Sequence, residues 1–336
     1  MKPVALMFLA AAMPAQIWIP QRSGTTASLR GVSAVNGKVV WASGAGGTYL
    51  RTTDGGATWR AAVVPGAESL DFRAVRAFDE RTAYLLSIGA GDKSRIYKTS
   101  DAGGQWRLLF TNPHPRGFLD ALAFWDALRG IALGDPVDGH FEVLTTEDGG
   151  EHWQARQTPP AEPQEGAFAA SNTCLAVMGK REAWFGTGGP GGARVFHSAD
   201  GGRTWTVAVT PIRNDAPSAG IFSLAFFARA GIAVGGDYTK PGKSQGNAAV
   251  TSDGGKTWAE PKGRPTGFRS AVAFTGGKRW VAVGTSGSDV SFDGGHDWQP
   301  RAGDGYNAVS FVGGHSAAGW AVGAKGAIAR FEAGRR

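Results

Sequence analysis

Thr52-Thr53-Asp54-Gly55-Gly56-Ala57-Thr58-Trp59 is the stretch that decides the fold, because the chain of 336 residues repeats it five more times in the same register. The further copies run from Thr99 to Trp106, Thr146 to Trp153, Ser198 to Trp205, Thr251 to Trp258 and Ser291 to Trp298. Successive copies lie between 40 and 53 residues apart. Self-similarity at such a period is typical of a repeat architecture in which each repeat is one small sheet.

The conserved chemistry of this octapeptide predicts a turn that holds itself together. A carboxylate can accept hydrogen bonds from backbone N–H groups of its own turn, glycine can adopt positive φ, and tryptophan can pack its ring on the sheet. The six copies are called boxes below. We assign a structural role, and no catalytic one, to their six aspartates and six tryptophans: Asp54, Trp59, Asp101, Trp106, Asp148, Trp153, Asp200, Trp205, Asp253, Trp258, Asp293 and Trp298.

The sequence between boxes alternates between apolar and other residues with a period of two. Inner runs such as 121–124, 223–226 and 271–274 precede second runs such as 280–284, and glycines separate them. Such runs predict short antiparallel strands. The second runs carry an aromatic residue in register: Trp41, Tyr84, Trp184, Trp280 and Trp320. The composition, with 52 glycines, 42% hydrophobic and 19% charged residues, describes a folded, turn-rich chain.

The last repeat, from Tyr306 to about Ala333, lacks the box and the outer strand that should follow it. The segment around Trp18 resembles the segments that follow the boxes, and Trp18 precedes Trp59 by 41 residues. We expect this N-terminal strand to complete the last sheet, because closing a ring removes an unpaired edge. The prediction is an all-β, seven-bladed β-propeller of four-stranded antiparallel blades, with the N-terminal strand closing the last blade.

The N-terminus predicts export. Met1-Lys2 is followed by an apolar stretch to about Met13 and then by Pro14-Ala15-Gln16, which is typical of a secretory signal peptide. We expect residues 1–15 to be a signal peptide and residues 16–336 a single propeller domain in the periplasm or outside the cell, with no transmembrane anchor. The single cysteine, Cys174, lies in an apolar run and is expected to be a buried small hydrophobe.

The repeated boxes resemble the Asp-box, or BNR repeat, of sialidases, xyloglucanase-type glycoside hydrolases and the photosystem II stability/assembly factor family. The resemblance covers nearly all of the chain after residue 15. One ring behind a signal peptide looks most like the assembly-factor group, which implies a non-enzymatic, protein-binding propeller with an arginine-rich surface. The box itself is a folding device and assigns no activity.

The enzymatic alternative is a glycoside hydrolase. A sialidase-like site could gather Arg30, Arg73 and Arg269 around Tyr306 at one end of the channel, although no glutamate is evidently placed beside the tyrosine. A two-carboxylate site could draw on four acids near strand ends: Asp120, Asp135, Asp138 and Asp237. We expect no cofactor and no metal site, since the histidines follow no zinc pattern and no phosphate-binding loop is present.

The hypothesis that we prefer to an enzyme is a binding surface. The chain carries a formal charge of +7 without any block of like charges, and no nucleic-acid motif accompanies it. On the face opposite the boxes we expect Arg30, Arg73 and Arg269 inside a basic rim made of Lys93, Arg95, Arg116, Arg213, Lys240, Lys243, Lys262 and Arg264. This monomeric propeller should hold an acidic protein segment or an anionic glycan there, and not nucleic acid.

Overall fold

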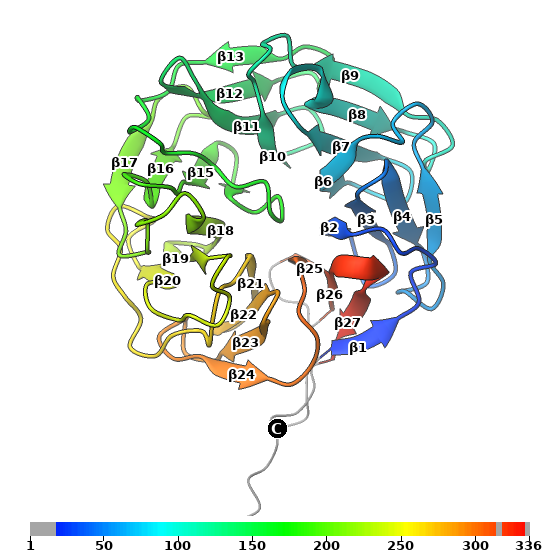
Figure 1. The fold of residues 1–336 in the computed structure, drawn as a ribbon. Coiled ribbons are helices and arrows are strands. Elements are labelled where there is room, and N and C mark those ends of the chain that lie inside the picture. Colours follow the sequence, from blue (N-terminus) through cyan, green and yellow to red (C-terminus); the bar gives the residue numbers. More distant parts are fainter. Residues whose placement is uncertain (1–17, 314–317, 333–336) are drawn as a thin grey trace, which may run out of the picture.

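The computed structural model describes residues 18–313 and 318–332 and contains seven antiparallel sheets arranged as a ring (Figure 1). The predicted signal peptide lies outside the described residues. Each sheet is one blade, and its strands follow one another from the channel outward. The prediction of an all-β, seven-bladed propeller is confirmed.

The first three blades are regular. Blade 1 comprises β2 (Leu29–Ala34), β3 (Val40–Gly44), β4 (Thr48–Thr52) and β5 (Arg60–Val63). Blade 2 comprises β6 (Asp71–Ala77), β7 (Ala83–Ile88), β8 (Arg95–Thr99) and β9 (Arg107–Thr111). Blade 3 comprises β10 (Leu119–Phe124), β11 (Gly130–Val137), β12 (His140–Thr146) and β13 (Gln154–Arg156).

Three further blades follow before the chain returns to its start. Blade 4 comprises β14 (Leu175–Met178), β15 (Glu182–Gly186), β16 (Arg194–Ser198) and β17 (Thr206–Val209). Blade 5 comprises β18 (Ala219–Phe227), β19 (Ala230–Asp237) and β20 (Ala248–Thr251). Blade 6 comprises β21 (Ala271–Gly276), β22 (Arg279–Gly284), β23 (Gly287–Ser291) and β24 (Gln299–Arg301).

Blade 7 is closed by the N-terminal strand, as predicted. It comprises β25 (Ala308–Phe311), β26 (Gly319–Val322), β27 (Ile328–Phe331) and β1 (Trp18–Gln21). Strand β1 pairs antiparallel with β27, with Trp18 opposite Phe331 and Gln21 opposite Ile328. The fully buried Trp18 ring packs on Tyr306 and Phe331 at centroid distances of 5.5 and 5.4 Å. Its indole N–H donates to Ser288 Oγ of blade 6 at 3.0 Å, so the closing strand is also tied to the neighbouring blade.

Blade 5 departs from the predicted four strands. After its box only a single bridge forms, in which Val250 and Ala259 exchange backbone hydrogen bonds of 2.9 and 3.0 Å. Pro261 follows two residues later. Proline has no N–H to donate to a ladder and restricts the residue before it, so the outer strand ends as soon as it begins.

The boxes form the turns between the third and fourth strands, and each is held by two side chains. In blade 1, Asp54 Oδ1 accepts from the backbone N–H of Thr58 at 2.9 Å and Oδ2 accepts from its hydroxyl at 2.6 Å. The Thr52 hydroxyl donates to Asp54 Oδ1 at 2.7 Å and accepts from the backbone N–H of Gly56 at 2.9 Å. In the other five boxes, too, the hydroxyl of the first threonine or serine accepts from the backbone N–H four residues later, a contact that was not predicted from the sequence.

Second-strand aromatic residues join neighbouring blades. Trp41, Tyr84, Trp184, Trp280 and Trp320 are all at most 2% exposed. The Tyr84 hydroxyl of blade 2 donates to the box carbonyl of Gly149 in blade 3 at 2.8 Å, and the Trp184 indole of blade 4 donates to that of Gly254 in blade 5 at 2.9 Å. Cys174 is fully buried, as expected. The aromatic column is therefore part of the contact between blades.

The ring has two unlike faces. Successive strands of a blade run in opposite directions, so the turn between the first and second strands and the box turn between the third and fourth lie at the same end of the blade. This side of the ring is called the box face. The connections between blades and the turns between second and third strands lie on the other, here called the connection face. The described part of the chain has only two helical turns, η1 (Gly91–Lys93) and η2 (Ala324–Gly326), and no helix there is long and apolar enough to cross a membrane.

Candidate binding pocket on the connection face

A pocket of about 490 Å³ opens where the channel meets the connection face. Its lining comes from the beginnings of first strands, the ends of second strands and the connection that leads into blade 4. This volume lies within the range of small-ligand sites. The pocket is therefore the candidate functional site.

A bulge at the same position of four first strands supplies the pocket's main side chains. The pairing register skips one residue in blades 1, 2, 3 and 5, and the skipped residues are Arg30, Arg73, Asp120 and Phe222. A bulge leaves one residue out of the ladder and redirects its side chain. All four of these residues line the pocket.

The residue before each bulge faces the core. Leu29, Phe72, Leu119 and Ile221 occupy that position and are fully buried. The glycine that ends the second strand packs closely on the backbone at this position: Gly44 at Leu29 in blade 1, and Gly134 at Phe118, next to Leu119, in blade 3. In blade 6 the corresponding Gly284 packs on Phe268 and Arg269. Arg269 therefore occupies the core position of blade 6, and Ser270 occupies the pocket position.

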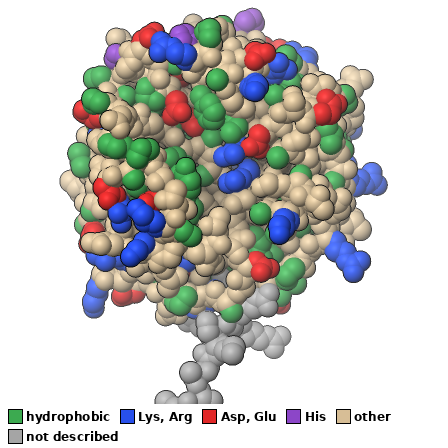
Figure 2. Space-filling view, viewed as in Figure 1, with side chains coloured by type: hydrophobic (Ala, Val, Ile, Leu, Met, Phe, Trp, Pro, Cys, Tyr) green, Lys and Arg blue, Asp and Glu red, His purple; other side chains and the backbone are tan. Residues whose placement is uncertain are grey.

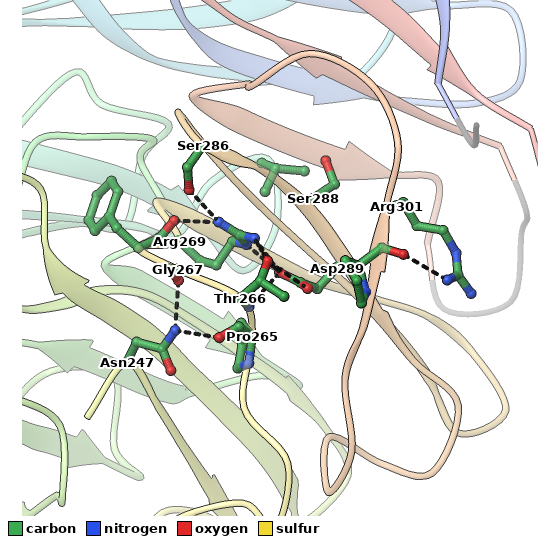
Figure 3. A network of polar contacts seen from close by, with 12 residues as sticks. Asn247, Pro265, Thr266, Gly267, Arg269, Ser286, Ser288, Asp289 and Arg301 are labelled. Carbon is green, nitrogen blue, oxygen red and sulfur yellow. Dashed lines mark hydrogen bonds and ion pairs between the residues drawn. The ribbon is translucent and has the colours of Figure 1, made fainter. Parts of the chain in front are cut away.

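Arg269 consequently takes no part in the exposed basic face. Its side chain is 0% exposed, and its Nε donates to Asp289 Oδ2 at 2.6 Å. Its remaining donors bond Phe268 O at 2.7 Å, Ser286 Oγ at 3.0 Å and Thr266 Oγ1 at 2.8 Å, a network that fixes the connection into blade 6 (Figure 3). Burial lowers the pKa of Arg269, and the neighbouring Asp289 opposes that shift.

Tyr306 occupies the core position of blade 7 in the same way. It is 3% exposed, packs on Trp18, and burial together with Asp304 raises its pKa to about 12. A nucleophilic tyrosine needs access to substrate and a partner that lowers its pKa. The predicted sialidase-like group is therefore not assembled, because Arg30 and Arg73 reach the pocket whereas Arg269 and Tyr306 lie in the core.

The two pocket arginines differ in their partners. Arg73 donates from Nε to Asp71 Oδ2 at 2.9 Å and from Nη1 to the Ala169 carbonyl at 2.9 Å. Arg30 is half-buried, and within the described residues it makes neither an ion pair nor a side-chain hydrogen bond. Burial lowers the pKa of Arg30, and the positive charge of Arg73 adds to the shift. Arg30 is thus a cation that the fold leaves without a counter-charge in contact.

Two of the four candidate acids come together in the pocket. Asp120 is 1% exposed, and burial, reinforced by Asp135, raises its pKa well above the ordinary range. Its Oδ2 has no hydrogen-bond partner among the described residues. Asp135 accepts from the backbone N–H of Ala167 at 2.9 Å, and burial raises its pKa as well. Burial thus shifts both carboxyl groups toward the neutral form.

The other two candidate acids lie elsewhere. Asp138 is exposed and paired with Arg116 at 2.6 Å. Asp237 is buried, accepts hydrogen bonds from Ser218 and Thr239 and pairs with Lys240 at 3.1 Å. Hydrogen bonds from these neighbours outweigh the opposing effect of burial and leave the pKa of Asp237 well below its usual range. No group of three His, Cys, Asp or Glu side chains in the described ranges could hold a metal ion.

Aromatic side chains form the opposite wall of the pocket. Phe168 and Phe222 stack with centroids 3.9 Å apart and an interplanar angle of 10°, and Phe268 meets Phe222 edge-on at 4.7 Å. These three residues are called the phenylalanine cluster below. Tyr238, which is 53% exposed, extends the wall toward solvent.

The connection into blade 4 carries Phe168 across the ring. It is held by Asp135 of blade 3, by Arg73 of blade 2 and by a 2.7 Å hydrogen bond from Ser171 Oγ to the carbonyl of Ser270 in blade 6. Figure 1 shows this connection reaching toward the middle of the ring. The ordered position of this segment over the channel end was not predicted from the sequence.

The predicted basic rim is a rim of mixed charge. Five of its eight cations have acid partners: Arg95 with Asp92, Arg116 with Asp138, Arg213 with Asp215, Lys240 with Asp237 and Arg264 with Glu260. Lys93, Lys243 and Lys262 form no ion pair with any acid in the described part of the chain. Figure 2 shows the same mixture, with blue side chains near the centre and both signs toward the edge.

The comparisons with known proteins agree with this architecture. No protein-family model and no curated protein matches the chain. Among solved structures it is similar to one titled "YCF48 bound to D1 peptide", with a TM-score of 0.68 and 18% identity over 96% of this chain and 100% of that chain. It shares the fold of YCF48.

Two further structures place that similarity in context. YCF48 from Cyanidioschyzon merolae gives a TM-score of 0.64 at 18% identity, covering 94% of this chain and 99% of its own. The WD40 propeller domain of Doa1 gives 0.63 at 13% identity, covering 96% and 98%. The expected resemblance to propellers of the photosystem II assembly-factor group is thus confirmed at the level of the fold.

Proposed function

We propose that this chain is a non-enzymatic, extracytoplasmic protein-binding propeller of the assembly-factor type, which holds an acidic segment of a partner protein on its connection face. The observation that carries the proposal is the half-buried guanidinium of Arg30, which faces the pocket without an ion pair or hydrogen bond among the described residues. A carboxylate is the natural partner of such a group. The bound peptide named for the similar YCF48 structure is consistent with this proposal.

The arrangement favours local recognition over long-range steering. Most of the rim cations are already neutralised by acids, and Arg73 is paired with Asp71, so the attraction concentrates at Arg30 and the few unpaired lysines. Exposed ion pairs contribute little to affinity, whereas a desolvated charge pair contributes more. We therefore assign the main role to the pocket and a secondary one to Arg116, Arg213 and Arg264.

Partner capture tests the proposal. The tagged mature chain is used to purify partners from a periplasmic or secreted fraction of the native source at low salt, in parallel with the double variant Arg30→Glu/Arg73→Glu. We expect the variant to lose a set of partners that the wild type retains, and to lose more of them as salt increases.

A matched control separates the face from net charge. Arg60→Glu/Arg81→Glu makes the same charge change at exposed residues of an outer strand and of a turn on the box face. The control should retain the partners. If the pocket variant remains folded and retains every partner, the proposed function is wrong.

Glycoside hydrolysis is the alternative that Asp120 and Asp135 keep open, because both line one pocket. A two-carboxylate mechanism needs one acid to be ionised as nucleophile or base while the other is protonated. Here burial raises the pKa of both. We expect no turnover of aryl glycosides, and activity abolished by Asp135→Asn at unchanged melting temperature would favour the enzyme instead.

A further inference from the structure

The pocket combines charged side chains with an aromatic wall. Blades 1 to 3 contribute the bulge residues Arg30, Arg73 and Asp120, whereas the phenylalanine cluster lies on the opposite side. A site with one polar and one aromatic side fits an amphipathic ligand, because the apolar part can leave water while the polar part is paired.

Two polar groups of the pocket lack partners within the described chain. The Arg30 guanidinium makes no hydrogen bond, and Oδ2 of the 1% exposed Asp120 accepts or donates none. Leaving the buried Asp120 oxygen without a partner costs about 1–3 kcal/mol, so its occurrence beside an open pocket points to a ligand atom, and the half-buried Arg30 adds an accessible positive charge.

We propose that the pocket binds an apolar carboxylate, a ligand whose carboxylate pairs with Arg30 and whose attached aromatic or aliphatic group packs on the phenylalanine cluster. Asp120 lies in the same pocket as a neutral carboxylic acid and donates its proton to an acceptor oxygen of the ligand. The inference deepens the proposed function, on which it rests for the choice of face, by naming the chemistry of the group that enters the pocket.

The charges around Asp120 favour this donor role over binding of an amine. Asp120 faces Asp135 of β11, Glu142 of β12, Arg73 of β6 and the thiol of Cys174 next to β14. Burial and Asp135 raise its pKa more than Arg73 lowers it, so the surroundings favour the protonated form of Asp120. An added anion would stabilise the protonated form further, whereas an ammonium ligand would expel the proton.

The sign of the proton linkage follows from this. A ligand that prefers protonated Asp120 binds with full affinity below the pKa of the free protein and loses affinity as pH rises through that pKa. Above the upper, ligand-bound pKa the affinity no longer depends on this group. Between the two values one linked proton changes affinity by about tenfold per pH unit.

Calorimetric titration with a graded series of probes tests the proposal. The acids are phenylacetate, 3-phenylpropanoate and 4-phenylbutanoate, which vary the distance between ring and carboxylate, and the counter-probes are 3-phenylpropanamide and 2-phenylethylammonium. Each titration is repeated in two buffers of different ionisation enthalpy to count protons. We expect one acid to bind best, with proton uptake at pH values between the pKa of Asp120 in the free protein and its pKa in the ligand-bound protein, and the amine to bind more weakly than that acid.

Two variants locate the site. Arg30→Met should weaken the best acid by about tenfold or more while leaving the amide unchanged, since it removes a charge-assisted hydrogen bond. Arg60→Met is the matched control and should have no effect. Asp120→Asn retains a donor and should retain binding at low pH but lose the pH dependence; if it fails to fold, proton counting on the wild type still decides.

A further pair of probes distinguishes the source of the ligand. A peptide with an internal Phe-Glu and both ends blocked represents a protein segment, and the free acids represent a small metabolite; binding of either one supports the proposal. Failure of the peptide and of every free acid, insensitivity to Arg30→Met, or tighter binding of the amine with proton release would overturn it. Partner capture lost in Arg30→Glu/Arg73→Glu without any probe binding would overturn this inference alone and leave the proposed function standing.

Discussion

At the scale of single residues, an arginine at the start of a first strand lies either in the pocket or in the core, depending on whether it occupies the bulge or the residue before it. Arg30 and Arg73 sit on bulges and reach the channel, whereas Arg269 sits one residue earlier and is fully buried. Shifting a strand residue by one position moves its side chain to the other face. The sequence analysis grouped the three arginines together because all of them precede or begin an inner run.

Removing Arg269 should therefore affect stability and leave binding intact in the folded fraction. Arg269→Met leaves Asp289 buried without its cation, which costs about 3–5 kcal/mol. Adding Asp289→Leu removes the uncompensated charge and should recover most of the loss. Denaturant titration of the single and double variants measures this, and equal stabilities of the two would contradict the account.

The box aspartates predict acid sensitivity. Hydrogen bonds from the side chain and backbone of Thr58 lower the pKa of Asp54 to about 2, and the same kind of contacts shift Asp200 to about 2. Their folded pKa lies below the unfolded value near 3.8, so their contribution is complete above that value and lost as pH falls toward 2. The melting temperature should drop steeply between pH 4 and 2.

Replacing one box aspartate tests the cause of that drop. Asp54→Asn keeps an acceptor for the Thr58 backbone but does not titrate, so the variant should lose stability at neutral pH and show a smaller change between pH 4 and 2. Thermal melts over that interval check it. An unchanged acid transition would mean that other carboxylates set it.

At the scale of the elements, the closing strand and the blade order followed from sequence, whereas the pocket did not. Repeats at a fixed spacing specify blades, and a missing outer strand at one terminus specifies where the other must pair. The phenylalanine cluster was missed because Phe168, Phe222 and Phe268 belong to three different connections or strands. The sequence nevertheless contains a pattern that marks the bulges. Four inner runs begin with an apolar residue, a variable residue and a small residue, as in Leu29-Arg30-Gly31 and Leu119-Asp120-Ala121, and the middle residue is the one that lines the pocket.

The closing strand should be essential to the whole ring. Trp18→Ala empties a fully buried site between blades 6 and 7 and should cost about 3–5 kcal/mol. Hydrogen exchange should then increase first in β1 and β27, because they pair directly. A variant of exposed Ile19 on the same strand serves as control, since Ile19→Ala removes little buried surface.

At the scale of the whole molecule, the rigid ring brings residues from blades that are far apart in sequence to one mouth of the channel. The mixed charge of the rim shows why net charge was a poor guide to the surface, because the total of +7 does not say which cations are paired with acids, and most of the rim cations are. Ion pairing depends on side-chain geometry that composition does not record. Function is therefore expected to depend on the pocket more than on the rim.

Hydrogen–deuterium exchange of the chain with a captured partner tests this central claim most directly. The account predicts protection concentrated at the start of β2, at the start of β6 and in residues 163–174, and no protection of the six box turns. The Arg30→Glu/Arg73→Glu variant should lose that protection at unchanged fold. Protection confined to the box face, or spread over the outer strands with the pocket unaffected, would contradict it.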